Sequence, residues 1–483
     1  MPNKVLELLS KEEIETIHSA SLTVLETTGV EIDNENVLRI LSNAGAQVDF
    51  HTRMVYIPEE LVKELVKKAP SQVKLCGFDD KHDILFAENN VYFNPGSTAL
   101  YMLDRETKAM RRPTPTDFAD FVRLTDALEY IHAQSTAMTV SDVPDQLVDR
   151  FRFYLILKNS SKPIIAGAFT IEGLYDMKHM LEIVLGGEEA LLKKPSLLMD
   201  VCPSPPLKWS KMTSQNLIDS ARFNIPIEII PAPQLGSTAP ATLAGLLVQH
   251  NAEFLSGLVM SQIVNAGLPV VYSGSPSLMD MRYGTGCVGN IEVAMLSAAY
   301  AQIARFYNIP SGAYLGISET KVVDAQTGLE STIGLIIGTL AGINCITGPG
   351  MLGFENCQSF EKLALDNEIC GMALRLARGI DVNEETLALD LIKEVGPGGH
   401  FLSKKHTLQW FQAEEYLPSV VIDKVGKAQW ERTGSKDTLN RAKMYVDKIL
   451  KEHYPKPLAS DVEKALDSFM TEILKRRNAD PPT

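Results

Sequence analysis

Hydrophobic residues recur at two spacings along the 483-residue chain, and the spacing changes near residues 70 and 114. Up to residue 70, apolar positions three or four residues apart predict helices, each ending at a glycine, in EEIETIHSASLTVLETTG and NENVLRILSNAG. From 71 to 112, shorter apolar runs predict strands, in QVKLCGF, DILFA, NVYFN and TALYMLD. We therefore expect residues 1–113 to form an N-terminal α+β region that caps the rest of the chain.

A regular alternation of strand-like and helix-like patterns begins at residue 114. The apolar runs predict strands at 131–140, 163–169, 196–202, 225–232, 268–274, 311–317, 343–348 and 379–383. A helical pattern follows each run, which predicts a (β/α)8 TIM barrel over residues 114–395. An open, doubly wound parallel sheet is the alternative. Residues 396–483 lack the alternation and predict a C-terminal helical extension.

Composition narrows the functional classes. The net charge of −14 argues against a nucleic-acid surface, which needs clustered Lys and Arg. The chain has no apolar run of membrane-spanning length and no signal-peptide pattern, so we expect a cytoplasmic protein without membrane contact. Six scattered cysteines without a CxxC pair fit reduced thiols. No ligand spacing suggests a metal site.

Polar residues gather in one stretch, GISETKVVDAQTGLE, which spans residues 316–330 between two apolar runs. It follows the sixth predicted strand, and barrel enzymes place their chemistry at the carboxyl ends of strands. Glu319 and Asp324 are therefore the candidate catalytic residues. Asp324 also suits the N-cap of a helix starting near Ala325. Glu330 is better explained as a packed polar group.

Aromatic residues follow several predicted strands. Tyr272, Tyr314 and Phe354 are expected at the same mouth, together with Tyr101 from the N-terminal region. A quaternary ammonium cannot donate a hydrogen bond, so proteins hold it against aromatic faces. Each ring taken singly is better explained as core, and several rings at one mouth would favour a binding site.

Two further patterns give weaker evidence of a functional site. GTGCVG, residues 284–289, matches GxGxxG but lies about ten residues beyond its strand, without a following acidic partner. We interpret it as a loop, or as backbone N–H groups that face an anion, rather than as a dinucleotide site. No nucleophile pattern is present. His400 and His406 would lie away from the mouth and are interpreted as structural.

Several ordered blocks are similar to one known family. They are SLTVLETTGVEI, PEELVKELVKKAPSQVKLCG, RRPTPTDFADFVRLTDAL, GSTAPATLAGLLVQHNAEFLSGLVMSQIVNAGLPVVY, KVVDAQTGLES and EVGPGGHFLSKKHT. With these blocks the sequence resembles the trimethylamine methyltransferase family over nearly its whole length. The resemblance implies a (β/α)8 barrel that moves a methyl group from an amine to the cobalt of a partner corrinoid protein.

The founding archaeal members of that family carry pyrrolysine, which this sequence lacks. It therefore resembles the pyrrolysine-lacking branch, whose members demethylate quaternary amines such as glycine betaine, carnitine or proline betaine. The resemblance implies that no cofactor is bound tightly and that the corrinoid resides on a partner protein. Glu319 would then face the ammonium, and Lys321 or Arg282 would pair with the carboxylate of a betaine. Apolar positions in the tail favour a homo-oligomer.

Two alternatives remain at this point. The first is a corrinoid-dependent methyltransferase of the same fold with another methyl donor. The second is a scaffold that binds a corrinoid protein without catalysis.

Overall fold

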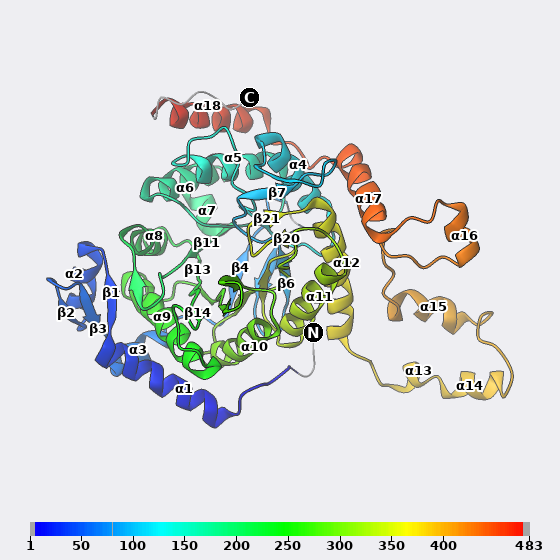
Figure 1. Ribbon diagram of the computed structural model, residues 1–483, viewed down its shortest axis with the longest axis horizontal. Coiled ribbons are helices and arrows are strands. Elements are labelled where there is room, and N and C mark those ends of the chain that lie inside the picture. Colours follow the sequence, from blue (N-terminus) through cyan, green and yellow to red (C-terminus); the bar gives the residue numbers. More distant parts are fainter. Residues whose placement is uncertain (1–4, 80, 477–483) are drawn as a thin grey trace.

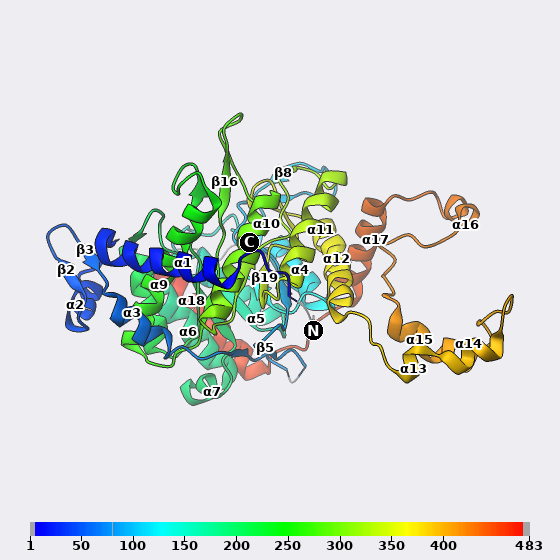
Figure 2. The ribbon, with the colours of Figure 1, turned by 90° about the horizontal axis from the view of Figure 1, so that it is seen from below.

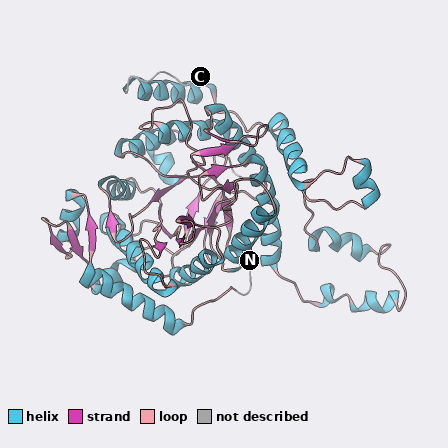
Figure 3. Ribbon diagram, in the orientation of Figure 1, coloured by secondary structure: helices cyan, strands magenta, loops and turns pink. Residues whose placement is uncertain are grey.

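The computed structural model describes residues 5–79 and 81–476, and it is an α/β structure with parallel strands at its centre (Figures 1 and 3). Within these residues, eight central strands form two hydrogen-bonded groups, ordered β15-β13-β11-β10-β9 and β18-β19-β6. The central strands are β6 (Tyr92–Asn94), β9 (Gln134–Ser135), β10 (Ile164–Ala166), β11 (Leu197–Val201), β13 (Ile227–Ile229), β15 (Val270–Tyr272), β18 (Gly312–Tyr314) and β19 (Cys345–Thr347).

The two groups of strands meet at both of their edges. Between β15 and β18, Tyr272 pairs with Ser311 in a parallel bridge. Between β6 and β9, the backbone N–H of His132 donates to the carbonyl of Phe93 at 2.7 Å. The arrangement is therefore barrel-like, in contrast to the two free edges of an open sheet. We call the side at the carboxyl ends of the strands the mouth and the opposite side the floor.

The eighth strand was predicted at 379–383, and this prediction is wrong. Those residues form no strand and are exposed. The position is filled by β6, whose Tyr92 and Phe93 pair in parallel with Cys345 and Ile346 of β19. A central parallel strand is buried on both faces and needs a continuous apolar run, which VYF provides and GIDVN does not.

Helices surround the central strands (Figure 1). They are α4 (Pro115–Ala127), α5 (Val148–Asn159), α6 (Ile171–Leu185), α8 (Lys211–Arg222), α9 (Leu243–Val264), α10 (Ile291–Phe306), α11 (Ala325–Leu340) and α12 (Phe360–Arg378), with the short α7 (Glu188–Lys193) after α6. Alternate strand residues such as Ile227 and Ile229 pack into the core shared with the helices. Because strand side chains alternate, Glu228 between them faces the interior.

The N-terminal residues form helices and a small sheet outside the central strands. These elements are α1 (Lys11–Thr23), η1 (Val24–Thr28), α2 (Glu35–Asn43), α3 (Glu59–Val66), and the strands β1 (Val30–Ile32), β2 (Gln47–Asp49) and β3 (Met54–Tyr56), joined by β12 (Lys208–Trp209). The hairpin of β4 (Val73–Leu75) and β5 (Ile84–Phe86) packs against Ala133, Ile165, Leu198 and Val271. This hairpin therefore fills the floor with apolar side chains.

Small sheets lie at the mouth. One contains β7 (Tyr101–Leu103), β8 (Met110–Arg111), β20 (Met351–Leu352) and β21 (Cys357–Gln358), and another contains β14 (Gln234–Leu235), β16 (Ser277–Asp280) and β17 (Thr285–Cys287). Figure 2 shows the β16–β17 hairpin projecting from this side and β5 on the opposite side. The loops that follow the central strands thus lie together at one end of the molecule.

The C-terminal region contains α13 (Glu384–Leu387), α14 (Leu389–Val395), α15 (Lys405–Glu414), α16 (Lys427–Arg432), α17 (Thr438–Glu452) and α18 (Ser460–Arg476). The last two pack on the outer helices, α17 on α4 and α12, and α18 on α5 and α6. The boundaries at 113 and 395 stay predictions. Among the described residues, no helix combines the length and apolar character that crossing a bilayer requires.

Candidate active site

Carboxyl groups from three elements meet in the interior near the mouth. Asp200 of β11 and Glu228 of β13 lie opposite each other in the parallel register. Glu355 belongs to the loop between β20 and β21. All three lie close enough to Tyr314 and Cys202 for their charges to raise the pKa of each. We call Asp200, Glu228 and Glu355 the carboxylate cluster.

Burial makes the cluster resist ionisation. It raises the pKa of both Glu228 and Glu355 to about 7. Burial, reinforced by the neighbouring charge of Glu228, raises the pKa of Asp200 well above its usual range. Both carboxyl oxygens of Glu228 and one of Asp200 are buried without a hydrogen-bond partner. Unpartnered buried oxygens of this kind are costly, and they are typical of sites that bind a cation or a proton donor.

Tyr314 is the aromatic residue beside the cluster. It belongs to β18, is 8% exposed, and burial raises its pKa well above the usual value. Two positions earlier on the same strand, Gly312 makes room for the acids. A Cβ there would lie 2.3 Å from Oε1 of Glu228 and 2.7 Å from Oγ of Ser273. A larger residue at 312 would therefore displace Glu228.

Two members of the cluster are partly exposed although protein surrounds them, whereas Glu228 is 1% exposed. Asp200 and Glu355 keep part of their surface exposed, and Cys202 is exposed. The surrounding protein nevertheless raises the pKa of the Cys202 thiol to about 12. Side chains that are both reachable and desolvated line the inside of a site rather than the outer surface.

Glu319 holds a neighbouring loop in place. Its Oε1 accepts hydrogen bonds from the backbone N–H groups of Val288 at 2.5 Å and Gly289 at 2.6 Å. These are the last residues of GTGCVG, whose N–H groups thus face an anion that belongs to the chain itself. Burial raises the pKa of Glu319, and its Oε2 has no partner. Glu330 is satisfied by Ser318 Oγ at 2.6 Å and by the N–H of Glu319 at 2.9 Å.

The other polar residues of the 316–330 stretch have identifiable contacts. Asp324 caps α11, accepting from the N–H groups of Gln326 and Thr327 at 3.0 and 3.3 Å. Lys321 donates to the carbonyl of Glu319 at 2.9 Å and lies 4.2 Å from the ring centre of Phe354. One face of Phe354 is therefore already occupied by a cation of the same chain.

The remaining predicted site residues lie apart from the cluster. Tyr272 is fully buried in the core between strands and helices, with its ring 3.9 Å from that of Phe254. Tyr101 is 37% exposed and lies beneath Arg112. Arg282 is at the exposed tip of the β16–β17 hairpin, paired with Asp280 at 2.6 Å. Of the four predicted rings, the structure brings Tyr314 to the carboxylate cluster.

A buried ion pair fixes the ends of β18 and β19. Lys362 and Asp366 of α12 are fully buried and 2.5 Å apart. Nζ of Lys362 also donates to the carbonyl of Gly316 at 2.8 Å, and Asp366 accepts from the N–H of Gly350 at 2.7 Å. The pair therefore ties the loops after both strands to one helix.

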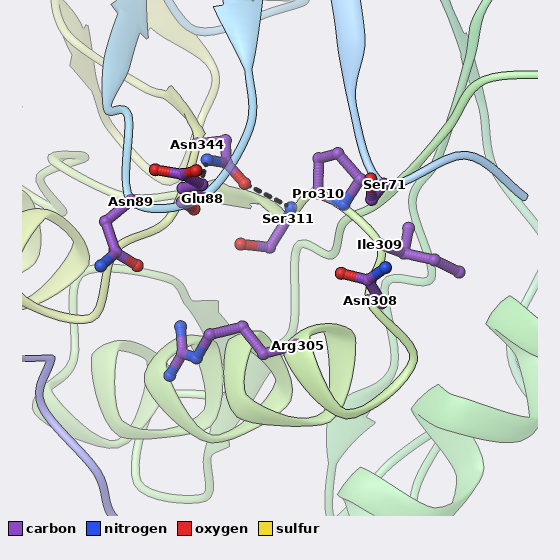
Figure 4. A pocket seen from close by; sticks show the side chains of 10 residues that line it. Ser71, Glu88, Asn89, Arg305, Asn308, Ile309, Pro310, Ser311 and Asn344 are labelled. Carbon is purple, nitrogen blue, oxygen red and sulfur yellow. Dashed lines mark hydrogen bonds between the residues drawn. The ribbon is translucent and has the colours of Figure 1, made fainter.

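A pocket with a volume of about 240 Å³ lies at the floor (Figure 4). Asn344 fills one wall, accepting from the N–H of Ser311 at 2.9 Å and donating to the carbonyls of Glu88 and Asn90. Several of the pocket's polar groups are thus held by Asn344, at the end of the strands where barrel enzymes carry stability rather than chemistry. The carboxylate cluster is the stronger candidate site.

Comparison with known proteins identifies the family. The family model described as "Trimethylamine methyltransferase (MTTB)" matches residues 2–480. The chain belongs to the trimethylamine methyltransferase family. It is 34% identical over 466 residues to trimethylamine methyltransferase MttB of Desulfitobacterium hafniense, covering 96% of this chain and 93% of that protein. It is 31% identical over 467 residues to a glycine betaine methyltransferase of the same species, covering 96% of both chains.

A solved structure shares the fold of this family member. The monomethylamine methyltransferase of Methanosarcina barkeri superimposes with a TM-score of 0.54 at 13% identity, covering 100% of this chain and 90% of that chain. At this identity the likeness concerns the fold alone. The resemblance that the sequence blocks indicated is thus confirmed.

The sequence indicated the cluster through acidic residues within apolar strands, and not through the positions of its aromatic residues. Asp200 and Glu228 interrupt the apolar strands SLLMDVC and IPIEIIPA. A carboxylate within a buried strand is too costly to keep unless it is paired or functional. Glu355 gave no comparable signal, because it follows Phe354 in an irregular loop. Among the described residues, no three His, Cys, Asp or Glu side chains are placed to hold a metal ion.

Proposed function

We propose that this chain transfers a methyl group from a quaternary ammonium substrate, of the glycine betaine type, to the Co(I) of a corrinoid on a partner protein. The central strands act as a closed (β/α)8 barrel whose mouth receives both reactants. The observation that carries the proposal is the carboxylate cluster, with its unpartnered oxygens beside Tyr314. The family membership and the glycine betaine methyltransferase relative support the same class of substrate.

The cluster and the ring complement such a substrate. A quaternary ammonium offers positive charge but no hydrogen-bond donor, so it needs nearby negative charge and an aromatic face. Glu228 and Asp200 supply the charge and Tyr314 supplies the ring. Of the two predicted cations, Lys321 is the better partner for the substrate carboxylate, because Arg282 is engaged by Asp280 at an exposed tip. One bond to Glu319 leaves Lys321 two further donors.

The chemical step places modest demands on the protein. Co(I) supplies the electron pair for the new Co–C bond, the N–CH3 bond breaks, and its electrons remain on nitrogen as a neutral tertiary amine. The donor is already a cation, so no acid has to protonate the leaving group. The chain therefore acts by orienting the substrate and excluding water. Neither Glu319 nor Asp324 needs to move a proton in this step, and both bind backbone N–H groups.

The location follows from the same chemistry. All six cysteines are free, and Co(I) persists only under reducing conditions. We accordingly assign the reaction to the cytoplasm.

Substrate affinity should rise with pH. The pKa of Glu228 and of Glu355 is about 7 in the empty site, and a bound cation favours their ionised forms. Binding then releases a proton below pH 7, so the Kd for glycine betaine should fall about tenfold per pH unit between 5.5 and 7 for each proton released. Calorimetry in buffers of different ionisation enthalpy measures both quantities. A Kd that is constant from pH 5.5 to 8 would contradict the role of the cluster.

Tyr314→Leu should weaken glycine betaine binding about thirtyfold, because a desolvated cation–π contact contributes about 2 kcal/mol. Turnover at saturating substrate should fall as well, since orientation is lost. Phe354→Leu should have a smaller effect, because Lys321 already covers that ring. Tyr101→Leu, at an exposed position, is the matched control. If Tyr314→Leu keeps the wild-type Kd and rate, the ammonium does not sit against this ring.

A further inference from the structure

The chain carries a projecting arm, residues 379–437, which contains α13 to α16 (Figures 1 and 2). It leaves the body at the end of α12 and returns at the start of α17. Several contacts hold its returning end on α12, among them two that join side chains. Glu414 pairs with Arg375 at 2.9 Å, and the Tyr416 hydroxyl donates to Glu368 at 3.0 Å. Beyond these contacts the helices of the arm extend away from the body.

The arm has no core of its own. None of the residues of α13, α14, α15 and α16 is buried. These helices have 4 to 10 residues, and isolated helices shorter than about 12 residues are marginal in water. Six large apolar side chains of the arm are at least 60% exposed, namely Ile380, Val382, Leu389, Leu402, Leu408 and Val420. An arm of this composition needs a surface to cover it.

The body of the same chain presents a matching apolar surface. Leu329 and Ile333 form an exposed stripe on α11, and Met372 and Leu376 form another on α12. The two helices pack against each other. Figure 1 shows them on the side of the barrel from which the arm projects. Outer barrel helices normally present polar side chains to water, so these stripes also lack a partner.

A groove at the base of the arm offers a further apolar surface for a second chain. It has a volume of about 760 Å³ and is lined by apolar residues that include Leu417, Val420, Trp430 and Met444. Protruding apolar residues, a groove and an apolar helix face thus occur on one side of a single chain. A twofold axis near the root of the arm would bring each arm onto the other chain, with every contact made twice.

We propose that the arm of one chain clasps the α11–α12 face of a second copy of this chain. The corrinoid protein is a poorer occupant, because its cobalt has to reach the mouth. Figure 2 shows α13, α14 and α15 of the arm at the floor level of β5 and away from the β16 hairpin at the mouth, whereas α16 lies at a higher level. This proposal does not depend on the proposed reaction.

Light scattering on the full-length protein tests the proposal. At micromolar concentration the wild type should be a dimer or a larger even-numbered assembly. The arm variant Leu402→Ser/Leu408→Ser and the body variant Leu329→Ser/Leu376→Ser should each weaken association about thirtyfold or more, the loss expected for central apolar contacts. Phe50→Ser, at an exposed position of the N-terminal region, is the control and should behave as wild type. Because all these side chains are exposed, thermal unfolding of the body should not change.

Mixing the two variants separates a clasp between chains from other contacts. The body variant keeps an intact arm and the arm variant keeps an intact face, so an equimolar mixture should regain dimers that neither variant forms alone. Failure of the mixture to associate would overturn the clasp, as would a monomeric wild type or an arm variant that stays fully associated. An arm variant that loses only its binding to the corrinoid protein would assign the arm to that partner instead.

Discussion

Glu228→Gln should reduce betaine-dependent methylation of the corrinoid at least about a hundredfold, because a buried carboxylate that faces a bound cation contributes several kcal/mol. The Gln side chain has nearly the same shape but no charge. Glu228 is 1% exposed, so the substitution removes a charge from a buried position, and the amide can still interact with the neighbouring Ser273. The Kd for glycine betaine should rise, and its dependence on pH should flatten.

The same substitution should stabilise the empty protein at alkaline pH. Burial raises the pKa of Glu228 from 4.5 to about 7 in the folded state. The contribution of such a group to stability is fully present below pH 4.5 and is lost as the pH rises through 7. At pH 8 the loss is on the order of 3 kcal/mol, from about 1.4 kcal/mol per pKa unit. Glu228→Gln should recover most of it in denaturant unfolding at pH 8.

Glu253→Gln is the matched control for this prediction. Burial raises the pKa of Glu253 to about 7 as well, but the residue lies on α9, where it accepts from the N–H of Leu207 at 2.9 Å. It should therefore give a similar gain in stability at pH 8 and leave methylation unchanged. If Glu228→Gln also leaves methylation unchanged, the cluster is a structural feature and not the substrate site.

Lys362→Met should destabilise the protein by about 3–5 kcal/mol, the cost of leaving a buried charge without its partner. Asp366 would keep only the N–H of Gly350, and the carbonyl of Gly316 would lose its donor. Because both glycines begin the loops at the mouth, turnover should fall even where the variant is still folded. Urea unfolding and the methylation assay measure the two effects.

A double variant separates the buried charge from the other contacts. Lys362→Met/Asp366→Asn removes both charges and keeps an acceptor for Gly350, so it should be more stable than Lys362→Met alone. The partly exposed pair of Lys158 and Asp467, 2.9 Å apart, provides a comparison. Lys158→Met should cost no more than about 1 kcal/mol. Equal destabilisation by Lys362→Met and Lys158→Met would show that the buried pair does not support the loops.

Periodicity predicted the strands well but not where the barrel begins. Seven of the central strands fall within predicted runs, and the four strand-like runs between 71 and 112 contain β4, β5, β6 and β7. In a cyclic strand order, however, the first and last strands are neighbours. The eighth strand position could therefore be filled by the run at 92–94 or by the run at 379–383. Periodicity counts strands, and it cannot tell that β4 and β5 fill the floor while β6 joins the parallel strands.

The candidate site was harder to predict, because aromatic residues occur both in hydrophobic cores and in sites that bind a quaternary ammonium. Tyr272 and Tyr314 both end a central strand, yet the first packs against Phe254 and the second lies at the carboxylate cluster. Val271 faces the interior, so the alternation along β15 turns Tyr272 outward. That register depends on strand pairing, which one sequence does not reveal. The cap by Asp324 was predicted correctly, because capping depends on local sequence alone.

The most direct test follows a single methyl transfer. The purified chain is mixed with glycine betaine and a Co(I) corrinoid, and the loss of Co(I) is followed by absorbance while the amine product is identified by mass. We expect methyl-Co(III) and dimethylglycine in equal amounts, with trimethylamine a poor donor. Transfer from trimethylamine but not from glycine betaine would contradict the quaternary substrate. In that case the unpartnered oxygens of Glu228 would accept a hydrogen bond from a protonated amine. Transfer from neither amine would contradict the proposed function itself.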